Sequence, residues 1–239
     1  MQKNTWVHLE SHPEIQVGQY IVPNFVSNSV AIKINQYEYV LISPGASLLK
    51  SWPDELKSPN CKIHIIMPNA WHFLGVKAWQ EAFENVVLYA SYQAKDKLIE
   101  KGAFTPSDNI QVLQDQQPPL PEGYGLLFPP GHRAGDVWLT KHVGKDNSTW
   151  ITCDSFLNYE RLSNQPVART MQKLLGAAPG LKMSMVIKWL ILNDKKAFKT
   201  WVLKQLEIDK PTTLIPSHGE VAQDENLKDK IKSMVTSRL

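Results

Sequence analysis

The sequence predicts an α/β fold in which two sheets pack together and helices cover their outer faces. Both halves of the chain begin with strand patterns and turn helical later, which favours sheets covered by helices over an all-β sandwich. The 239 residues are 43% hydrophobic and 21% charged, ordinary usage for a globular protein with a sizeable core. At about 150 residues per typical domain, we expect one domain spanning residues 1–239.

The first half alternates short β-rich runs with two helical patterns. Residues 30–34 and 37–42 are β-rich runs joined at Asn35-Gln36, as in a hairpin. The other expected elements are a strand at 62–67, a helix at 76–83 with apolar residues at helical spacing, a short buried strand at 86–90 and a charged helix at 94–101.

The second half follows a Pro-rich connection at residues 117–121. The elements expected after it are a strand at 124–128, a hairpin of 137–143 and 149–153 with its turn at 144–147, a helical pattern over 166–206 interrupted at Pro179-Gly180, a strand at 212–215 and a terminal helix at 225–234.

The net charge and the lengths of the apolar runs indicate which partners and which cellular compartment to expect. A net charge of +3 is too small to imply a polyanionic partner, so we expect no nucleic acid. The longest apolar run, residues 185–192, is interrupted by Lys188 and is far shorter than a membrane span, and the polar residues 1–10 are unlike a signal peptide. Cys61 and Cys153 read as two buried thiols. We therefore expect a cytoplasmic protein with no membrane partner, and a homo-oligomer stays open.

Four side chains share one position in the predicted fold. His72, His132 and His218 each lie just past a predicted strand, next to Gly or Pro, and Asp154 has the same position. Strand ends that converge on one edge of a sheet are where α/β proteins place ligands. The sequence thus predicts four candidate ligands from four loops.

The segments around these residues resemble the metallo-β-lactamase fold superfamily. Its signature is His-x-His-x-Asp-His, then a Gly-His-x-x-Gly loop, a strand-end Asp and a strand-end His. The matching segments are Pro68-Asn69-Ala70-Trp71-His72-Phe73-Leu74-Gly75, Pro130-Gly131-His132-Arg133-Ala134-Gly135-Asp136, Thr152-Cys153-Asp154-Ser155 and Ile215-Pro216-Ser217-His218-Gly219-Glu220. The resemblance runs from Asn28 to about Gly219, with Ser43-Pro44-Gly45 where the family has Asp-x-Gly. It implies a four-layer αββα sandwich of two mixed sheets.

The resemblance assigns a role to each of the four residues. His72 falls on the last His of the first motif, His132 on the loop His, Asp154 on the bridging carboxylate and His218 on the final His. Three other ligand positions of the motif are occupied by residues that are poor ligands for a hard metal ion, namely Met67, Asn69 and Trp71. His132 and Asp154 alone remain for the first metal, which is too few.

His72, Asp154 and His218 remain for the second metal. Two imidazoles and one carboxylate with open positions suit one divalent ion, zinc before iron or manganese. The resemblance thus implies a metal-dependent hydrolase that attacks an ester, thioester, lactone or amide of a small molecule through metal-activated water. His132 and Asp154 are the expected catalytic residues, and His132 is also kept as a metal ligand.

Two other functions stay open. The first is a metal-free pseudoenzyme that holds no cofactor and binds a small molecule or a protein in the same cleft, with Trp71 filling the vacated metal space or walling a pocket. The second is a redox protein with non-haem iron, because the superfamily includes persulfide dioxygenases and diiron flavoproteins.

Several other residues have less specific signals. Arg133 is either a surface residue or a contact for an anionic group of the substrate. Glu220 is either a surface residue or a carboxylate that orients His218. We expect His64 and His142 to be exposed or hydrogen-bonded strand positions. The remaining aromatic candidates, expected at core or helix-packing positions, are Trp189 and Trp201. The apolar stretch 181–192 could also cover the site or make a dimer contact.

Overall fold

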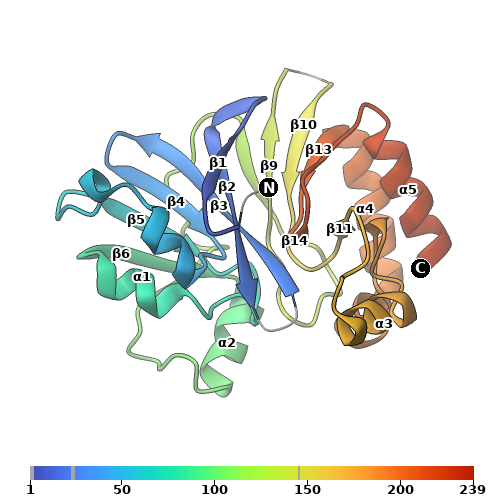
Figure 1. Cartoon of the computed structure of the whole chain (residues 1–239), viewed down its shortest axis with the longest axis horizontal. Helices are drawn as coiled ribbons and strands as arrows, with labels where there is room; N and C mark the ends of the chain where they lie inside the picture. Colours follow the sequence, from blue (N-terminus) through green and yellow to red (C-terminus); the bar gives the residue numbers. More distant parts are fainter. Residues whose placement is uncertain (1–2, 23–24, 145) are drawn as a thin grey trace. The chain divides into compact units, whose positions relative to one another are not determined.

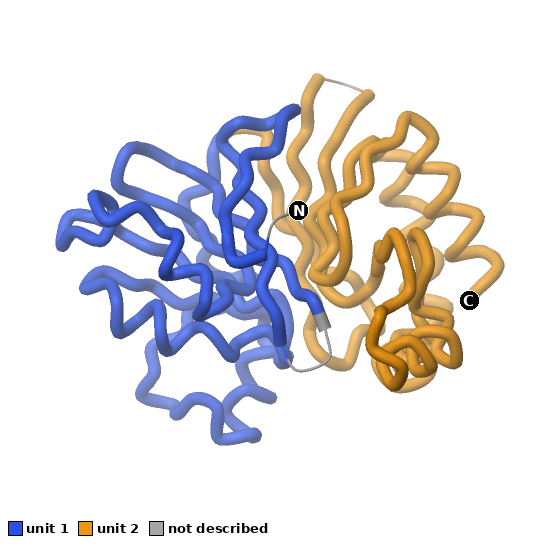
Figure 2. The backbone as a smooth tube through the Cα atoms, viewed as in Figure 1, with its two compact units in different colours: residues 1–121 blue, residues 122–239 orange. Residues whose placement is uncertain are grey.

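The computed structural model describes residues 3–22, 25–144 and 146–239. The chain divides into two compact units, Met1–Pro121 and Glu122–Leu239 (Figure 2). Each unit contains strands, helices and a buried apolar cluster. The single domain spanning residues 1–239 stays a prediction.

Unit 1 contains a mixed sheet whose strands pair in chain order (Figure 1). The pairs are antiparallel from β1 to β4 and parallel from β4 to β7. The predicted hairpin at residues 30–42 is confirmed, whereas β1 and β2 were not predicted. The strands are β1 (Trp6–Leu9), β2 (His12–Val22), β3 (Phe25–Asn35), β4 (Glu38–Ile42), β5 (Lys62–Ile66), β6 (Asn85–Ala90) and β7 (Ile110–Val112).

The helices of unit 1 are short and are held by buried aromatic rings. They are η1 (Ala46–Ser51), η2 (Asp54–Leu56), α1 (Val76–Ala82) and α2 (Tyr92–Glu100). The α2 helix begins at a Ser91 cap, whose hydroxyl accepts from the Ala94 N–H. Trp79 of α1 stacks on Phe83 at 5.6 Å and donates its indole N–H to the Gly45 carbonyl at 3.1 Å. Trp79 therefore fixes α1 against the segment that follows β4.

Unit 2 contains a five-stranded mixed sheet in the order β15-β13-β10-β9-β8. Only the β10–β13 pair is parallel. The predicted hairpin is confirmed as β9 and β10, although Lys145 of its turn lies outside the described residues. The strands of unit 2 are β8 (Tyr124–Leu127), β9 (Trp138–His142), β10 (Ser148–Ile151), β11 (Leu157–Tyr159), β12 (Gly180–Lys182), β13 (Pro211–Ile215), β14 (His218–Gly219) and β15 (Ala222–Gln223), with β12, β11 and β14 paired in that order.

The predicted helical pattern over 166–206 is interrupted more often than the sequence indicated. It contains α3 (Pro166–Leu174), strand β12, a π-helical turn η3 (Ile187–Ile191) and α4 (Lys195–Asp209), and α5 (Leu227–Arg238) ends the chain. Trp201 packs on the core cluster as expected. The expectation is wrong for Trp189, whose side chain is 58% exposed, because η3 buries Ile187 and Ile191 on its opposite side.

The remaining expectations about single residues are met. Cys61 and Cys153 are both buried thiols. His64 lies 2.9 Å from a Glu38 carboxylate oxygen, and His142 pairs with Asp209 at 3.3 Å. In the part of the chain that the structure describes, no helix is long and apolar enough to cross a membrane.

Candidate metal centre

His72 is held in unit 1 by the loop that follows β5. Its ring is buried, and Nδ1 lies 2.8 Å from the Ser43 hydroxyl oxygen. Gly75 allows this loop to approach the end of β4, because a Cβ there would lie 1.9 Å from the Pro44 carbonyl oxygen. The sequence therefore needs glycine at this position to bring His72 and Ser43 together.

The Ser43 hydroxyl is itself fixed by its surroundings. Ser43 has a positive φ of 52°, donates its N–H to the Ile66 carbonyl and accepts the Ser29 hydroxyl at 2.7 Å on its own carbonyl oxygen. The Tyr20 hydroxyl lies 3.3 Å from Ser43 Oγ. When His72 Nδ1–H donates to Ser43, the Nε2 lone pair is the one that can bind an electrophile.

The three positions at which the resembling motif has other ligands hold Met67, Asn69 and Trp71, and two of these residues are buried in unit 1. Met67 is completely buried in the core of unit 1. Asn69 is also buried, and its side-chain oxygen accepts the Trp71 N–H at 2.8 Å, which shapes the turn. Trp71 is 40% exposed, with the Lys101 ammonium 5.2 Å from its ring centroid. Trp71 thus lies at a surface and does not fill a buried space.

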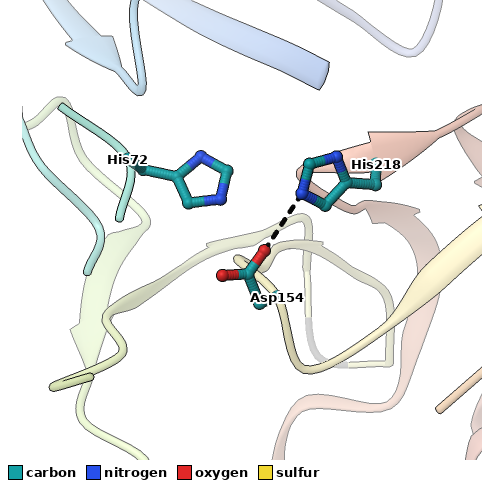
Figure 3. A group of neighbouring side chains, drawn as sticks. All are labelled: His72, Asp154 and His218. Carbon is teal, nitrogen blue, oxygen red and sulfur yellow. Dashed lines mark ion pairs between the residues drawn. The ribbon is translucent and has the colours of Figure 1, made fainter. Parts of the chain in front are cut away.

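Asp154 and His218 face each other within unit 2. Asp154 follows β10 by three residues, and His218 begins β14. His218 Nε2 lies 3.1 Å from Asp154 Oδ1, with both side chains mostly buried. Figure 3 shows this ion pair as a dashed line, together with the side chain of His72.

Close backbone contacts position this pair. Thr152 donates its N–H to the Ile215 carbonyl, which ties the segment before Asp154 to the end of β13. Gly219 has a φ of +96°, and a Cβ there would lie 2.1 Å from the Asn158 carbonyl oxygen. Only glycine lets β14 pair with β11 at this distance.

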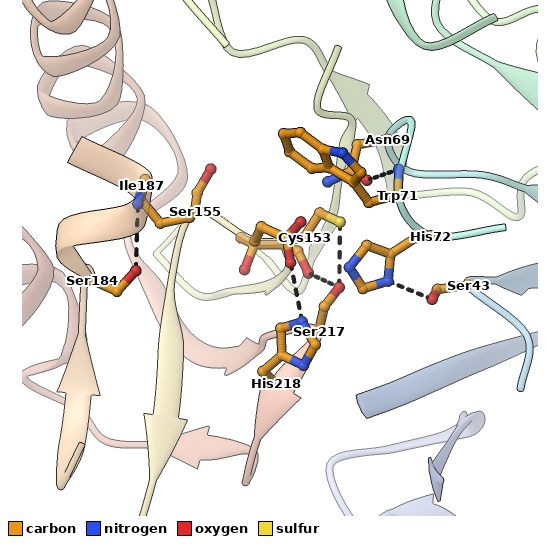
Figure 4. A network of polar contacts seen from close by, with 12 residues as sticks. Ser43, Asn69, Trp71, His72, Cys153, Ser155, Ser184, Ile187, Ser217 and His218 are labelled. Atoms are coloured by element: carbon orange, nitrogen blue, oxygen red, sulfur yellow. Dashed lines mark hydrogen bonds and ion pairs between the residues drawn. The ribbon is translucent and has the colours of Figure 1, made fainter. Parts of the chain in front are cut away.

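The neighbouring thiol is structural. The Ser217 hydroxyl lies 3.4 Å from Cys153 Sγ (Figure 4). Burial, followed by the charges of Asp154 and Asp136, raises the pKa of the Cys153 thiol well above its usual value. Cys153 therefore stays protonated and does not offer a thiolate.

His132 has a different environment in unit 2. Its ring is completely buried, and Nε2 lies 3.5 Å from the Asp136 carboxylate. That carboxylate accepts from the Trp138 indole N–H at 3.0 Å and from the Ser155 hydroxyl at 2.8 Å. Sequence reasoning missed Asp136, although it lies four residues after His132 in the segment that carries the resemblance.

Arg133 and Glu220 were predicted as weaker site candidates, and Tyr159 is a residue near Asp154 that the sequence analysis did not single out. Arg133 is exposed, as a surface arginine would be, and Glu220 donates its N–H to the Asn158 carbonyl. Tyr159 was missed by the sequence analysis. Burial, followed by the charge of Asp154, raises the pKa of its phenol, so Tyr159 stays protonated and can donate a hydrogen bond.

The donor set chemically fits a metal ion. His72, Asp154 and His218 offer two imidazoles and one carboxylate, and among the described residues they form a group that could hold a metal ion. This group does not include His132.

Comparisons with known proteins place the fold. No family model matches the chain, and no curated protein matches it in sequence. Structural similarity extends over nearly the whole chain to a metallo-β-lactamase from Hirschia baltica, with a TM-score of 0.60, 16% identity and 97% of this chain and 96% of that chain covered. The mono-zinc form of a metallo-β-lactamase from Pseudomonas aeruginosa matches with a TM-score of 0.59 and 14% identity, and the match covers 98% of this chain and 95% of that chain.

A flavo di-iron protein shares the fold as well. A flavo di-iron protein from Thermotoga maritima matches with a TM-score of 0.63 and 16% identity, covering 97% of this chain and 60% of that chain. The chain therefore has a metallo-β-lactamase-like α/β fold with two mixed sheets, as predicted. The fold alone does not select between hydrolytic and redox chemistry.

Proposed function

We propose that this protein is a metal-dependent hydrolase with a mononuclear site. The proposed ligands are His72, Asp154 and His218, and the proposed substrates are small molecules with an ester, thioester, lactone or amide carbonyl. The observation that carries the proposal is the Asp154–His218 pair, in which an imidazole nitrogen and a carboxylate oxygen face each other at 3.1 Å.

The separation of these two atoms suits a shared zinc ion. Ligand atoms about 2.1 Å from a tetrahedral zinc stand about 3.4 Å apart. The 3.1 Å between His218 Nε2 and Asp154 Oδ1 therefore needs only a small adjustment. Zinc is the first metal to test, because it favours three protein ligands with one position left for water.

The metal ion and the side chains around it have separate tasks in the proposed reaction. A bound zinc ion would lower the pKa of a water molecule to about 7 and so supply hydroxide for attack on a carbonyl. Ser43 holds His72 so that Nε2 is presented. With a metal bound, Asp154 would accept the proton that the bound water gives up, and the protonated Tyr159 phenol, which the charge of Asp154 reaches, could donate a hydrogen bond to the substrate oxygen.

We leave His132 out of the proposed ligand set, because its ring nitrogens are buried beside Asp136. Its predicted catalytic role is tested by the His132→Gln variant. A variant that binds zinc and hydrolyses substrate as well as the wild type would assign His132 a purely structural role.

The first experiment measures the metal content of the tag-free protein by mass spectrometry after incubation with zinc, iron or manganese. We expect about one zinc per chain, and loss of that zinc in His72→Ala and His218→Ala. His8→Ala is the matched control, because His8 is exposed and its ring nitrogen Nδ1 lies 2.7 Å from the Pro13 carbonyl oxygen. Near-zero metal in the wild type would overturn the proposal.

The His72 variant also tests whether both units contribute. If His218→Ala abolishes zinc binding and His72→Ala does not, the ligand set is confined to unit 2 and the three-ligand proposal is wrong. With zinc bound, a panel of esters, thioesters, lactones and amides should reveal a turnover that chelator and Asp154→Asn both abolish.

The metal-free pseudoenzyme is the second candidate. Burial of Met67 in the core and use of Asn69 in a turn favour it, because both positions now have structural tasks. Under this alternative the wild type binds no metal, and His218→Ala leaves ligand binding unchanged.

A further inference from the structure

Exposed apolar side chains gather in one part of unit 2. Five of the large apolar residues that are exposed lie between positions 167 and 190, on α3 and η3. We call these five residues the α3 surface: Val167, Met171, Leu174, Trp189 and Leu190. Apolar side chains that cluster on a surface mark an interaction site more often than scattered ones do.

The α3 helix turns its apolar face to solvent. Val167, Met171 and Leu174 are spaced by four and three residues, so they share one face. No residue of α3 is buried, and the Val167 and Leu174 side chains are 78% and 73% exposed. Figure 1 shows α3 at the outer edge of unit 2.

The η3 turn continues this surface. Met185 donates its N–H to the Leu175 carbonyl at 2.8 Å, which joins the end of α3 to the turn that carries Trp189. The ammonium groups of Lys188 and Lys195 lie 5.3 and 4.1 Å from the Trp189 ring centroid. Positive charge therefore borders the exposed indole directly.

The surrounding segment is strongly basic. Residues 161–200 contain eight Lys and Arg residues and a single acidic residue, Asp194, whereas the whole chain has a net charge of only +3. The rest of the chain is therefore net negative. A partner that meets the exposed indole of Trp189 encounters the positive charges of Lys188 and Lys195 beside it.

We propose that the α3 surface docks on an anionic lipid bilayer. An amphipathic helix with basic residues, next to a turn that exposes a Trp and a Leu, has the chemistry that inserts shallowly between anionic headgroups. A second copy of the chain fits less well, because two such surfaces would bring like charges together. A bound peptide uses a groove or a strand edge, whereas the five residues of the α3 surface lie on a helix and a π-helical turn.

This interaction is peripheral and independent of the proposed metal site. It needs no membrane-spanning helix, and the described chain has none. It departs from the sequence-based expectation of no membrane partner, which considered only membrane spans and signal peptides.

The test is flotation of the full chain with vesicles of phosphatidylcholine, alone or with one third phosphatidylglycerol, at about 0.05 M and about 0.5 M salt. We expect binding to the anionic vesicles at low salt and little binding to the neutral ones. Trp189→Ala with Leu190→Ser should weaken binding about fivefold or more, and Lys173→Glu should weaken it as well.

Two matched variants control for exposed apolar area and for charge. Ile208→Ser removes an exposed apolar side chain of α4, and Lys77→Glu reverses an exposed charge on α1, so both should bind as the wild type does. The proposal is overturned if the anionic vesicles bind nothing at low salt, or if all variants bind equally.

Other occupants give different results. A wild-type dimer that the Trp189 and Leu190 double variant converts to monomer would assign the α3 surface to self-association. Binding to immobilised polyglutamate but to neither vesicle would assign it to an acidic protein. Either result overturns the lipid proposal.

Discussion

Ser43→Ala removes one hydroxyl and isolates what holds His72. Ser43 Oγ lies 2.8 Å from His72 Nδ1, and both residues are buried, so the variant leaves a ring nitrogen without this partner. Alanine keeps the Cβ at a residue whose φ is 52°, so the backbone cost is the same as for serine. The change therefore reports mainly on the lost hydrogen bond.

Two magnitudes follow from this geometry. Loss of a buried hydrogen bond should lower the free energy of unfolding by about 1–2 kcal/mol, measured by urea titration of the metal-free protein. Loss of a partner that orients a metal-bound imidazole should weaken zinc binding about 10–100-fold, or about 1.4–2.7 kcal/mol, measured by competition with a chromophoric chelator.

Ser47→Ala is the matched control, because the Ser47 hydroxyl makes an exposed hydrogen bond to Asn4 in the same unit. It should change neither quantity appreciably. A Ser43→Ala protein that loses stability but binds zinc within twofold of the wild type would refute the reasoning, because His72 would then not depend on Ser43 for its orientation as a ligand.

Three further predictions concern the loop, pH and metal removal. Gly75→Ala places a Cβ 1.9 Å from the Pro44 carbonyl oxygen and should destabilise the protein by about 1–3 kcal/mol or more in urea, whereas Gly125→Ala, with its nearest atom at 3.4 Å, should cost much less. Burial lowers the pKa of His64 below its usual 6.5, so the unfolded chain binds the proton more readily. Stability should therefore be fully present above pH 6.5 and fall as the pH drops through the folded pKa, and a urea series over pH should show a smaller fall in His64→Gln. Zinc at about 100 times its Kd should raise the free energy of unfolding by about 2.7 kcal/mol and the melting temperature by about 5–10 °C. A chelator should reverse this shift in the wild type, whereas His218→Ala should show no shift with zinc.

The sequence predicted the fold class better than its element boundaries. The strands at 62–67 and 86–90 and the hairpin of unit 2 carry β-rich runs closed by Pro, Gly or Asn, and local chemistry is enough to find them. Strand β2 (His12–Val22) was missed, because its polar residues and Gly18 weaken the pattern that pairing with β3 makes stable. Strand β12 was missed for a similar reason, since three residues carry no detectable period.

The candidate site was predictable as residue identities but not as contacts. The strand-end positions of His72, Asp154 and His218 follow from local patterns, and the family resemblance supplies their order. The Ser43–His72 hydrogen bond joins residues 29 positions apart, and the His132–Asp136 contact depends on how a loop closes. Neither leaves a periodic signal, so only the structure reveals them.

We expect the His72 loop to fold without a metal ion. In a loop shaped by metal coordination, removal of the metal leaves ligands that repel or stay unsatisfied. Here Met67 anchors the loop in the core, Asn69 closes its turn, and Ser43 holds the remaining histidine. Because packing and hydrogen bonds hold the loop that carries His72, the loop should keep its position in the metal-free chain. Metal binding would then add stability to a folded protein instead of creating the fold, which is why a chelator should lower the melting temperature without unfolding the chain at room temperature.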